Sequence, residues 1–296
     1  MSAASFKQRV LSTSIARIFG GILVCFVVFI LAQQLAANLF DVFPVDRNSR
    51  NLIKGLISSA AVVWTYRSFY GRIEHRAVTE LSLSRWGRTI GTGLALGAVL
   101  QGLTILVIAL LGKVQVVAVK PAASVLIPLS VAFSVAIFEE VMLRGILFRI
   151  AEEKLGSYWA LAISALVFGL LHLANPGSTL LSGLCVVVAG AVFGLAYVAT
   201  RNLWLPIAIH FAWNFVQSGI FGAVTSGNEK TSSLLTTNLM GHPLLTGGAF
   251  GPEASFQAVL LLLLAAALLQ QKAKRNLIIP RRNHKPAASA EVVLAG

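Results

Sequence analysis

The sequence has little charge, and acidic residues are especially scarce. Only 12% of its 296 residues are charged, and 24 lysines and arginines stand against 11 aspartates and glutamates. Hydrophobic residues make up 56% of the chain and the mean hydropathy is +0.80. Soluble domains carry about twice this share of charged residues. The composition therefore excludes an ordinary soluble domain and indicates a polytopic membrane protein.

Further absences exclude other classes. The only two cysteines, Cys25 and Cys185, lie inside apolar runs, so we expect buried free thiols and no disulfide framework. The alternating pattern of a membrane β-barrel is missing, which leaves helices as the spanning elements. No glycine-rich phosphate loop, HExxH helix or GxSxG turn occurs, which argues against nucleotide-binding proteins, zincins and α/β-hydrolases.

Eight apolar segments are long enough to cross a bilayer. We predict an all-α polytopic bundle of about eight transmembrane helices, at about 16–38, 52–70, 90–112, 122–150, 159–174, 178–199, 203–223 and 254–270. The Gly/Ser/Thr-rich stretch 224–253 is predicted to be a loop. Residues 271–296 are basic and then Ala-rich, and are predicted to be a disordered tail.

The basic residues predict the orientation. With the N terminus in the cytoplasm, 18 lysines and arginines fall on the cytoplasmic side of these spans and 6 on the other. This asymmetry predicts that both termini are cytoplasmic. The first span could instead be a signal peptide. Because the basic residues flank apolar runs, the net charge of +13 is interpreted as a topology signal, and no nucleic-acid partner is expected.

Ionisable side chains interrupt the apolar segments first at FEEVMLRG (138–145). Glu140 and Arg144 are four residues apart, so on a helix they share a face and can form an ion pair. Glu139 is rotated by about 100° and has no local partner. A carboxylate in a pocket of low dielectric can act as a general acid or base. The alternative is a structural ion pair that only locks helices together.

Two further motifs follow, FGLLH (168–172) and HFAWN (210–214). His172 could be catalytic or a hydrogen-bonded core residue. His210 and Asn214 point the same way on a helix, so their donors could hold a developing oxyanion or could join neighbouring helices. Together with Glu139 these side chains favour a catalytic site, although a glutamate and two histidines are also possible zinc ligands.

The three motifs EEVMLR (139–144), FGLLH and HFAWN resemble, in this order, the EExxxR, FxxxH and HxxxN motifs of the CPBP family of intramembrane proteases. That family includes the CAAX prenyl endopeptidases and bacterial relatives linked to bacteriocin maturation or immunity. The approach to the third motif, YVATRNLWLPIAIHFAWN (197–214), is also similar to the family. The resemblance covers about residues 122–223.

The resemblance implies a glutamic-type, metalloendopeptidase-like intramembrane endopeptidase that uses no metal or cofactor. Glu139 and His172 would activate a water molecule, and His210 and Asn214 would hold the oxyanion. The supporting residues would be Glu140, Arg144 and Phe168. The expected partners are the lipid bilayer and a peptide or protein substrate, lipidated substrates included, and the expected location is a bacterial plasma membrane.

The resemblance divides the chain into N-terminal transmembrane helices (1–121), a CPBP-like catalytic core (122–223), an extracytoplasmic loop with the last helix (224–270) and the tail (271–296).

Two other functions stay open. One is a non-catalytic scaffold or immunity protein of the same fold. The other is a proton-coupled transporter, but the sequence lacks the second polar cluster that a transporter with two related halves would have.

One expectation conflicts with the others. With each helix centred in the bilayer, Glu139 and His210 lie at a similar depth, about 4 Å from the midplane, and His172 lies about 9 Å to the other side. Either its helix is shifted, with 151–158 folded into the bundle, or the pairing with Glu139 is wrong. The cavity is expected to open to the cytoplasm, with the 224–253 loop on the far side.

Overall fold

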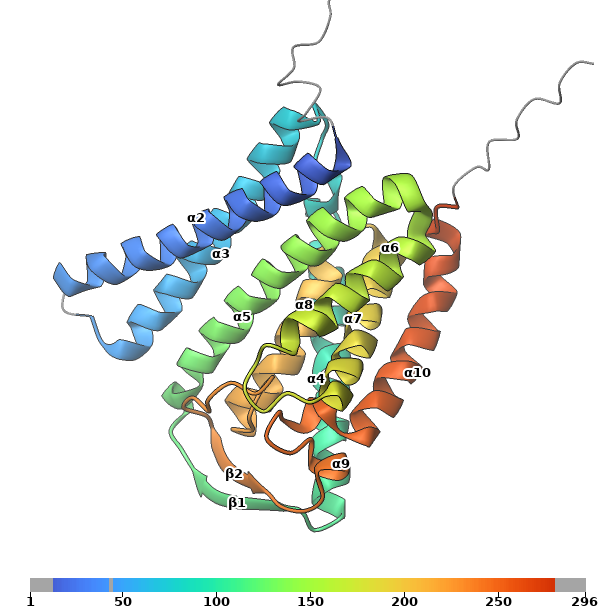
Figure 1. Ribbon diagram of the computed structural model, residues 1–296. Coiled ribbons are helices and arrows are strands. Elements are labelled where there is room, and N and C mark those ends of the chain that lie inside the picture. The colour runs from blue at the N-terminus through green and yellow to red at the C-terminus, as the bar shows by residue number, and fades with distance from the viewer. Residues whose placement is uncertain (1–12, 43–44, 280–296) are drawn as a thin grey trace, which may run out of the picture.

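The computed structural model describes residues 13–42 and 45–279, which form a bundle of long helices (Figure 1). The elements in chain order are α2 (Ser14–Val42), α3 (Arg47–Ile73), η1 (Thr79–Leu81), α4 (Trp86–Leu110), β1 (Val114–Val119), η2 (Ala122–Val125), α5 (Leu126–Glu140), η3 (Val141–Phe148), α6 (Arg149–His172), α7 (Leu180–Thr200), α8 (Trp204–Phe215), η4 (Val216–Ile220), β2 (Leu235–Leu239), α9 (Pro243–Thr246), η5 (Pro252–Ala254), α10 (Phe256–Ala273) and η6 (Lys274–Asn276).

Large apolar side chains cover much of the outside of the bundle. On α2, for example, Ile15, Phe19 and Leu23 are 71%, 70% and 61% exposed. Water disfavours an apolar surface of this extent, whereas lipid accommodates it. Within residues 13–42 and 45–279, five stretches are long and apolar enough to cross a membrane: Ser14–Phe40, Trp86–Leu110, Ala122–His172, Leu180–Thr200 and Phe256–Asn276. The chain is therefore an integral membrane protein, as predicted.

These five stretches correspond to six of the eight predicted spans, because Ala122–His172 covers 122–150 and nearly all of 159–174. The other two predicted spans lie in α3 and α8. The sequence of α3 is interrupted by basic residues, among them Lys54 and Arg67. Helix α8 has only 12 residues and continues as the π-helical segment η4. The number of eight spans therefore stays a prediction.

A break at Gly156 divides α6. Its φ of 77° and ψ of 170° belong to a region that is open almost only to glycine. The chain turns here, so 149–155 forms a short helix and 157–172 runs back through the bundle (Figure 1). Glu152 and Ser157 are buried beside the turn, and Glu152 pairs with Arg201 at 2.5 Å. Residues 151, 152, 156 and 157 are therefore buried at this turn, whereas 153–155 and 158 are exposed.

Close packing of α4 against α8 places the helix that carries the third motif. A Cβ atom at Gly97 would lie 2.2 Å from the carbonyl oxygen of Ile209, and one at Gly93 would lie 2.6 Å from Cβ of Ala208. Small residues four apart allow such close backbone approach between membrane helices. The position of His210, next to Ile209, therefore depends on these glycines.

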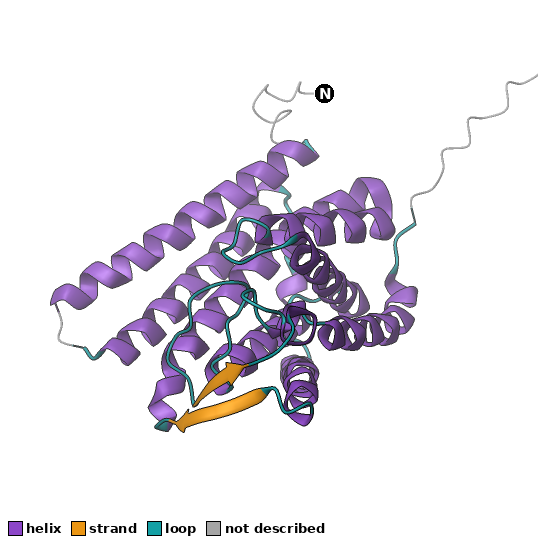
Figure 2. Cartoon of the chain, turned by 60° about the horizontal axis from the view of Figure 1, so that its bottom comes forward, coloured by secondary structure: helices purple, strands orange, loops and turns teal. Residues whose placement is uncertain are grey.

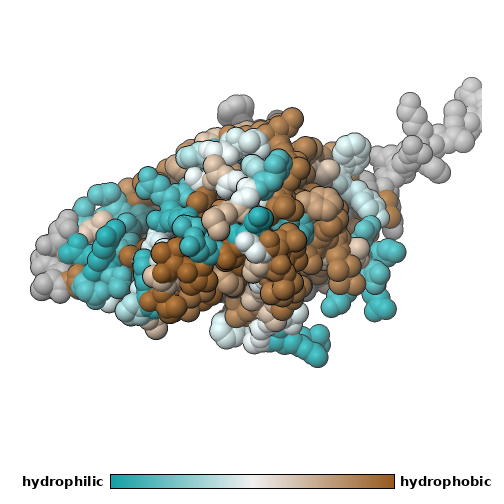
Figure 3. Space-filling view, turned by 90° about the horizontal axis from the view of Figure 1, so that it is seen from below, coloured by the Kyte–Doolittle hydropathy of each residue, from teal (hydrophilic) through white to brown (hydrophobic). Residues whose placement is uncertain are grey.

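The structure contains one small sheet, which the all-α prediction did not include. Strands β1 and β2 pair antiparallel, with Val114 opposite Leu239 and Val119 opposite Leu235 (Figure 2). The β-branched run VQVVAV favours a strand, but it is too short to stand out beside the apolar helices. On this end of the molecule hydrophobic and hydrophilic residues are both exposed (Figure 3).

The described ends of the chain lie together at the end of the bundle opposite to this sheet (Figure 1). Residues of the predicted tail are ordered here: α10 continues to Ala273, and Asn276 donates to the carbonyl oxygen of Val198 at 3.1 Å. The predicted disordered tail therefore does not begin at 271. Its remaining part, 280–296, lies outside the described residues.

Candidate active site

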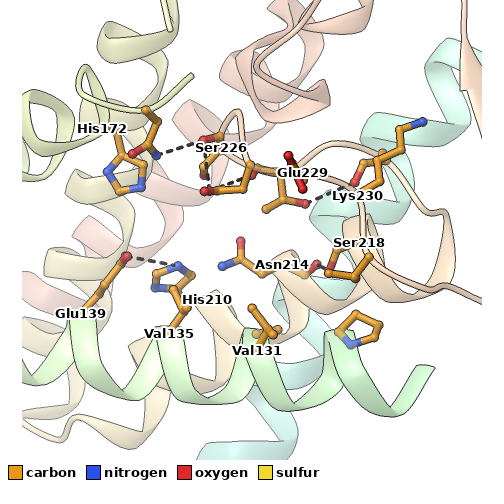
Figure 4. Close-up of a pocket in the computed structure, with 17 residues that line it drawn as sticks. Val131, Val135, Glu139, His172, His210, Asn214, Ser218, Ser226, Glu229 and Lys230 are labelled. Carbon is orange, nitrogen blue, oxygen red and sulfur yellow. Dashed lines mark hydrogen bonds and ion pairs between the residues drawn. The ribbon is translucent and has the colours of Figure 1, made fainter. Parts of the chain in front are cut away.

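A cavity of about 440 Å³ lies between α5, the end of α6, α8 and the loop that follows η4. All four side chains that were predicted to be catalytic line it (Figure 4): Glu139, His172, His210 and Asn214. They come from three helices, α5, α6 and α8. The sequence analysis therefore predicted correctly that these four residues lie in one cavity.

The ion pair expected from the first motif is present. Arg144 Nη1 donates to Glu140 Oε1 at 2.9 Å, and both side chains are fully buried. The same oxygen lies 3.0 Å from His210 Nδ1. Arg144 Nη2 also donates to the carbonyl oxygen of Gly190 at 2.7 Å. This network joins α5, α7 and α8.

Aromatic rings enclose the network. The Arg144 guanidinium lies 4.9 Å from the ring centroid of Phe168 and 5.4 Å from that of Phe193, within the range of cation–π contacts. Phe193 also stacks on His210, with centroids 4.7 Å apart and an interplanar angle of 13°. Phe168 thus contacts the site as expected. Phe193 is a further contact that the sequence analysis missed.

Glu139 faces the cavity beside His210 (Figure 4). Its Oε2 lies 3.8 Å from His210 Nε2, and this buried oxygen has no hydrogen-bond partner among the described residues. The side chain is 26% exposed, whereas that of Glu140 is 0% exposed. The two adjacent carboxylates therefore differ as the spacing predicted: Glu140 is tied to Arg144, whereas Glu139 is partly exposed and has no such partner.

The tautomer of His172 follows from its neighbour. Its Nδ1 lies 2.9 Å from the carbonyl oxygen of Phe168, which can only accept, so Nδ1 carries the proton. In the neutral ring, Nε2 then holds a lone pair, and His172 lines the cavity opposite Glu139 (Figure 4). The conflict over depth is thereby resolved: the turn at Gly156 and the placement of α6 bring His172 to the same cavity.

Asn214 lies one turn after His210 and points into the cavity (Figure 4). Directly after it the backbone changes to π-helical geometry in η4, as it does after Glu140 in η3. Such segments occur frequently at functional sites because they re-aim side chains. The carbonyl oxygen of Asn214 accepts from Ser218 Oγ at 2.8 Å.

The loop expected on the far side is in fact a wall of the cavity. Lining residues in it include Thr225, Ser226, Glu229 and Lys230 (Figure 4). It belongs to the end of the bundle opposite the described termini (Figure 1). The expectation that this loop lies on the far side from the cavity is therefore wrong. Segment 224–253, which connects η4 to α10, folds back onto the bundle and covers the cavity.

A buried carboxyl group anchors this loop. Glu253 Oε1 accepts from Ser226 N at 2.5 Å and from Ser226 Oγ at 2.8 Å, and Gln217 donates to Oε2. Burial raises the pKa of Glu253 to about 8, and the hydrogen bonds from Ser226 oppose the rise. Ser226 and Glu253 also border the small space beside His172 and His210. The sequence analysis missed them, although an acid in GPEAS just before an apolar helix was a usable signal.

No group of three or more His, Cys, Asp or Glu side chains in residues 13–42 and 45–279 is arranged to hold a metal ion. Glu139 and His210 approach each other, but Glu140 is occupied by Arg144. Cys25 and Cys185 are both buried and unpaired, as expected.

The fold and the site thus define a helical membrane protein with Glu, His and Asn side chains gathered in one cavity. Residues 121–216 match the family model described as type II CAAX prenyl endopeptidase Rce1-like. This match supports the resemblance to the CPBP family that the three motifs indicated. The matched residues include all four cavity side chains and the Glu140–Arg144 pair.

A curated relative supports the same assignment. The Bacillus subtilis protein named "Putative membrane peptidase YdiL" is 32% identical over 78 residues, which are 26% of this chain and 30% of the relative. The match thus spans less than a third of that protein's length. No solved structure matches the chain significantly.

Proposed function

We propose that this chain is an intramembrane endopeptidase of the glutamic type, which hydrolyses a peptide bond near the membrane with an activated water molecule. The observation that carries the proposal is the convergence of Glu139, His172, His210 and Asn214 on one cavity. The family match of residues 121–216 and the peptidase name of the relative support hydrolysis of peptide bonds.

Glu139 and His172 are the proposed water-activating pair. Glu139 Oε2 has an unused acceptor site, and His172 Nε2 has a lone pair because Nδ1 donates to Phe168. A water molecule between them can lose a proton as it attacks the scissile carbonyl carbon, and the same proton can pass to the leaving amine. The second transfer restores both residues.

His210 and Asn214 are the proposed oxyanion donors. The Asn214 amide donates directly. His210 donates through Nε2 only if Nδ1–H, which faces Glu140, is kept as well, so the donating ring is an imidazolium. Glu139 and Glu140 would then balance Arg144 and His210 in charge, which favours burial of the cluster. A neutral His210 would instead present a lone pair at Nε2 and act as a base.

The substrate is proposed to be a prenylated C terminus, a leader peptide or another membrane protein. Apolar Val131, Ala132 and Val135 of α5 form one wall of the cavity, and polar loop residues form another. An extended segment with apolar side chains on one edge and its backbone facing the polar wall would fit between them.

For the whole chain we propose eight crossings of a bacterial plasma membrane with both termini in the cytoplasm. The 18-to-6 distribution of basic residues supports this orientation. In this orientation the loop wall of the cavity lies on the extracytoplasmic side.

Cleavage of a peptide library by purified protein, prenylated C-terminal peptides included, tests the function. We expect wild type to cleave, and Glu139→Gln and His172→Ala to be inactive while they remain folded in detergent. A chelator should have no effect, and inhibition by it would favour a metal-dependent reaction. Biological function that survives Glu139→Ala would favour the scaffold, and proton flux in liposomes would favour the transporter.

A further inference from the structure

A second cavity, of about 670 Å³, lies at the end of the bundle that carries the described termini. It is formed where the start of α4 meets the ends of α7 and α10 and the loop before α8. It shares no lining residue with the cavity around Glu139. Its chemistry must therefore be explained separately.

The lining of this second cavity is strongly basic. Arg85, Arg88, Arg201 and Lys272 line it, and no carboxylate does. Arg201 is neutralised by Glu152 at 2.5 Å. The other three cations make no ion pair with any residue in 13–42 or 45–279, although carboxylates at the same end pair with Arg17 and Arg149. Three uncompensated positive charges thus border one hollow.

Neutral hydrogen-bonding groups and an apolar wall complete the lining. The hydroxyl and amide groups belong to Thr79, Ser82, Ser84, Thr89, Thr92, Thr200 and Asn202. Leu205 and Leu269, which are 6% and 7% exposed, and Leu96 on α4 form the apolar part. A ligand that fits both parts is an anion joined to a hydrocarbon chain.

The depth of the cavity agrees with such a ligand. The apolar stretch of α4 begins at Trp86, which is 50% exposed, and Trp204 at the start of α8 donates to the Leu81 carbonyl oxygen at 3.4 Å. Tryptophans mark the level of the lipid head groups in membrane proteins. The cations therefore stand at head-group level, and Leu96 lies farther along α4 toward the hydrocarbon.

We propose that this cavity binds an anionic phospholipid. Arg85, Arg88 and Lys272 would hold the phosphate by charge-assisted hydrogen bonds, and the hydroxyl groups would bind the remaining head-group oxygens. Leu96, Leu205 and Leu269 would contact the first part of an acyl chain. Basic pockets between membrane helices are suited to this class of ligand.

Native mass spectrometry of the delipidated full chain in detergent tests the proposal. The probes are phosphatidylglycerol, phosphatidylcholine and inorganic phosphate, each titrated separately and in competition. We expect one saturable site that prefers phosphatidylglycerol over phosphatidylcholine by about 10-fold. Arg85→Gln combined with Arg88→Gln should weaken phosphatidylglycerol binding by about 30-fold, because each charge near a membrane surface contributes about 1 kcal/mol.

The matched control removes two other exposed arginines, Arg67 and Arg72 of α3, which do not line the cavity. Arg67→Gln combined with Arg72→Gln should change binding less than 3-fold. Thr92→Trp adds bulk to the cavity at constant charge and should also weaken binding. Equal binding of both lipids, or equal loss in both double variants, would overturn the proposal. Displacement of the lipid by inorganic phosphate would assign the site to a free phosphate instead.

Discussion

Glu140 Oε1 contacts two basic groups at once, Arg144 at 2.9 Å and His210 at 3.0 Å. A buried carboxylate in this position fixes the orientation of the histidine ring, as the acid of a catalytic triad does. Glu139, its neighbour in the chain, makes no hydrogen bond through Oε2, which lies 3.8 Å from His210 Nε2. At the scale of single residues, the adjacent acids thus differ in their contacts: Glu140 holds the His210 ring, and Glu139 is the acid that we propose for water activation.

The role of Asn214 can be tested by shortening it. Asn214→Ala should lower kcat by about 10²- to 10³-fold with little change in KM, as removal of an oxyanion donor does. The control is Ser218→Ala, since Ser218 also lines the cavity but only binds the Asn214 carbonyl oxygen. Steady-state kinetics on one cleaved peptide measure both, and a similar loss in both variants would rule out the proposed role.

At the scale of elements, the contact between α4 and α8 should control activity from a distance. Gly97→Leu must push α8 away, because its Cβ would meet the Ile209 carbonyl oxygen at 2.2 Å. A Cβ atom at Gly91 on the same helix would meet nothing within 4 Å, so Gly91→Leu is the matched control. We expect Gly97→Leu to lose at least 10²-fold in kcat/KM, as misplaced catalytic groups do, and Gly91→Leu to be normal. Equal activities would contradict this dependence.

The loop that walls the cavity should respond to pH through Glu253. Its folded pKa of about 8 exceeds its ordinary value of 4.5, so the neutral form is favoured in the folded state. Its contribution to stability is complete below about pH 4.5 and is lost as the pH rises to about 8, by at most about 5 kcal/mol. Thermal unfolding between pH 5 and 8.5 should show this decline in wild type.

The matched variant is Glu253→Gln, which keeps the shape of the side chain and removes the titrating group. Its Tm should vary less over the same pH range. Parallel Tm profiles for wild type and variant would show that Glu253 is not responsible. Peptide cleavage measured in the same buffers would show whether activity also declines as Glu253 ionises and the loop is destabilised.

The elements that sequence reasoning located well are those with a strong local signal. Glu140 and Arg144 pair because helical spacing places them on one face, and His210 and Asn214 share a face for the same reason. The contacts of Ser226 and Phe193 with the site depend on how distant segments fold back. No local pattern encodes such contacts, so the sequence alone did not predict them.

For the whole molecule, the apolar runs predicted a helical membrane bundle. They did not predict the depth of His172, which depends on the turn at Gly156, or the contact of the 224–253 loop with the cavity, which depends on the path of the loop.

Orientation can be tested with single cysteines at Thr231 and Ser84, both exposed and at opposite ends, in a Cys25→Ala, Cys185→Ala background. We expect an impermeant thiol reagent on intact cells to label position 231 and not 84. The reverse labelling would place the cavity wall in the cytoplasm.

The volume of the candidate active-site cavity limits the length of peptide substrate that can enter it. Its 440 Å³ falls in the lower half of the range of about 300–1,000 Å³ that suits small ligands, so only a few extended residues can enter. A membrane helix would have to unwind there and leave backbone groups unpaired in lipid, at several kcal/mol for each group. A frayed end at the membrane surface avoids this cost. Local disorder in the substrate, as much as its sequence, would then decide which bonds are cut.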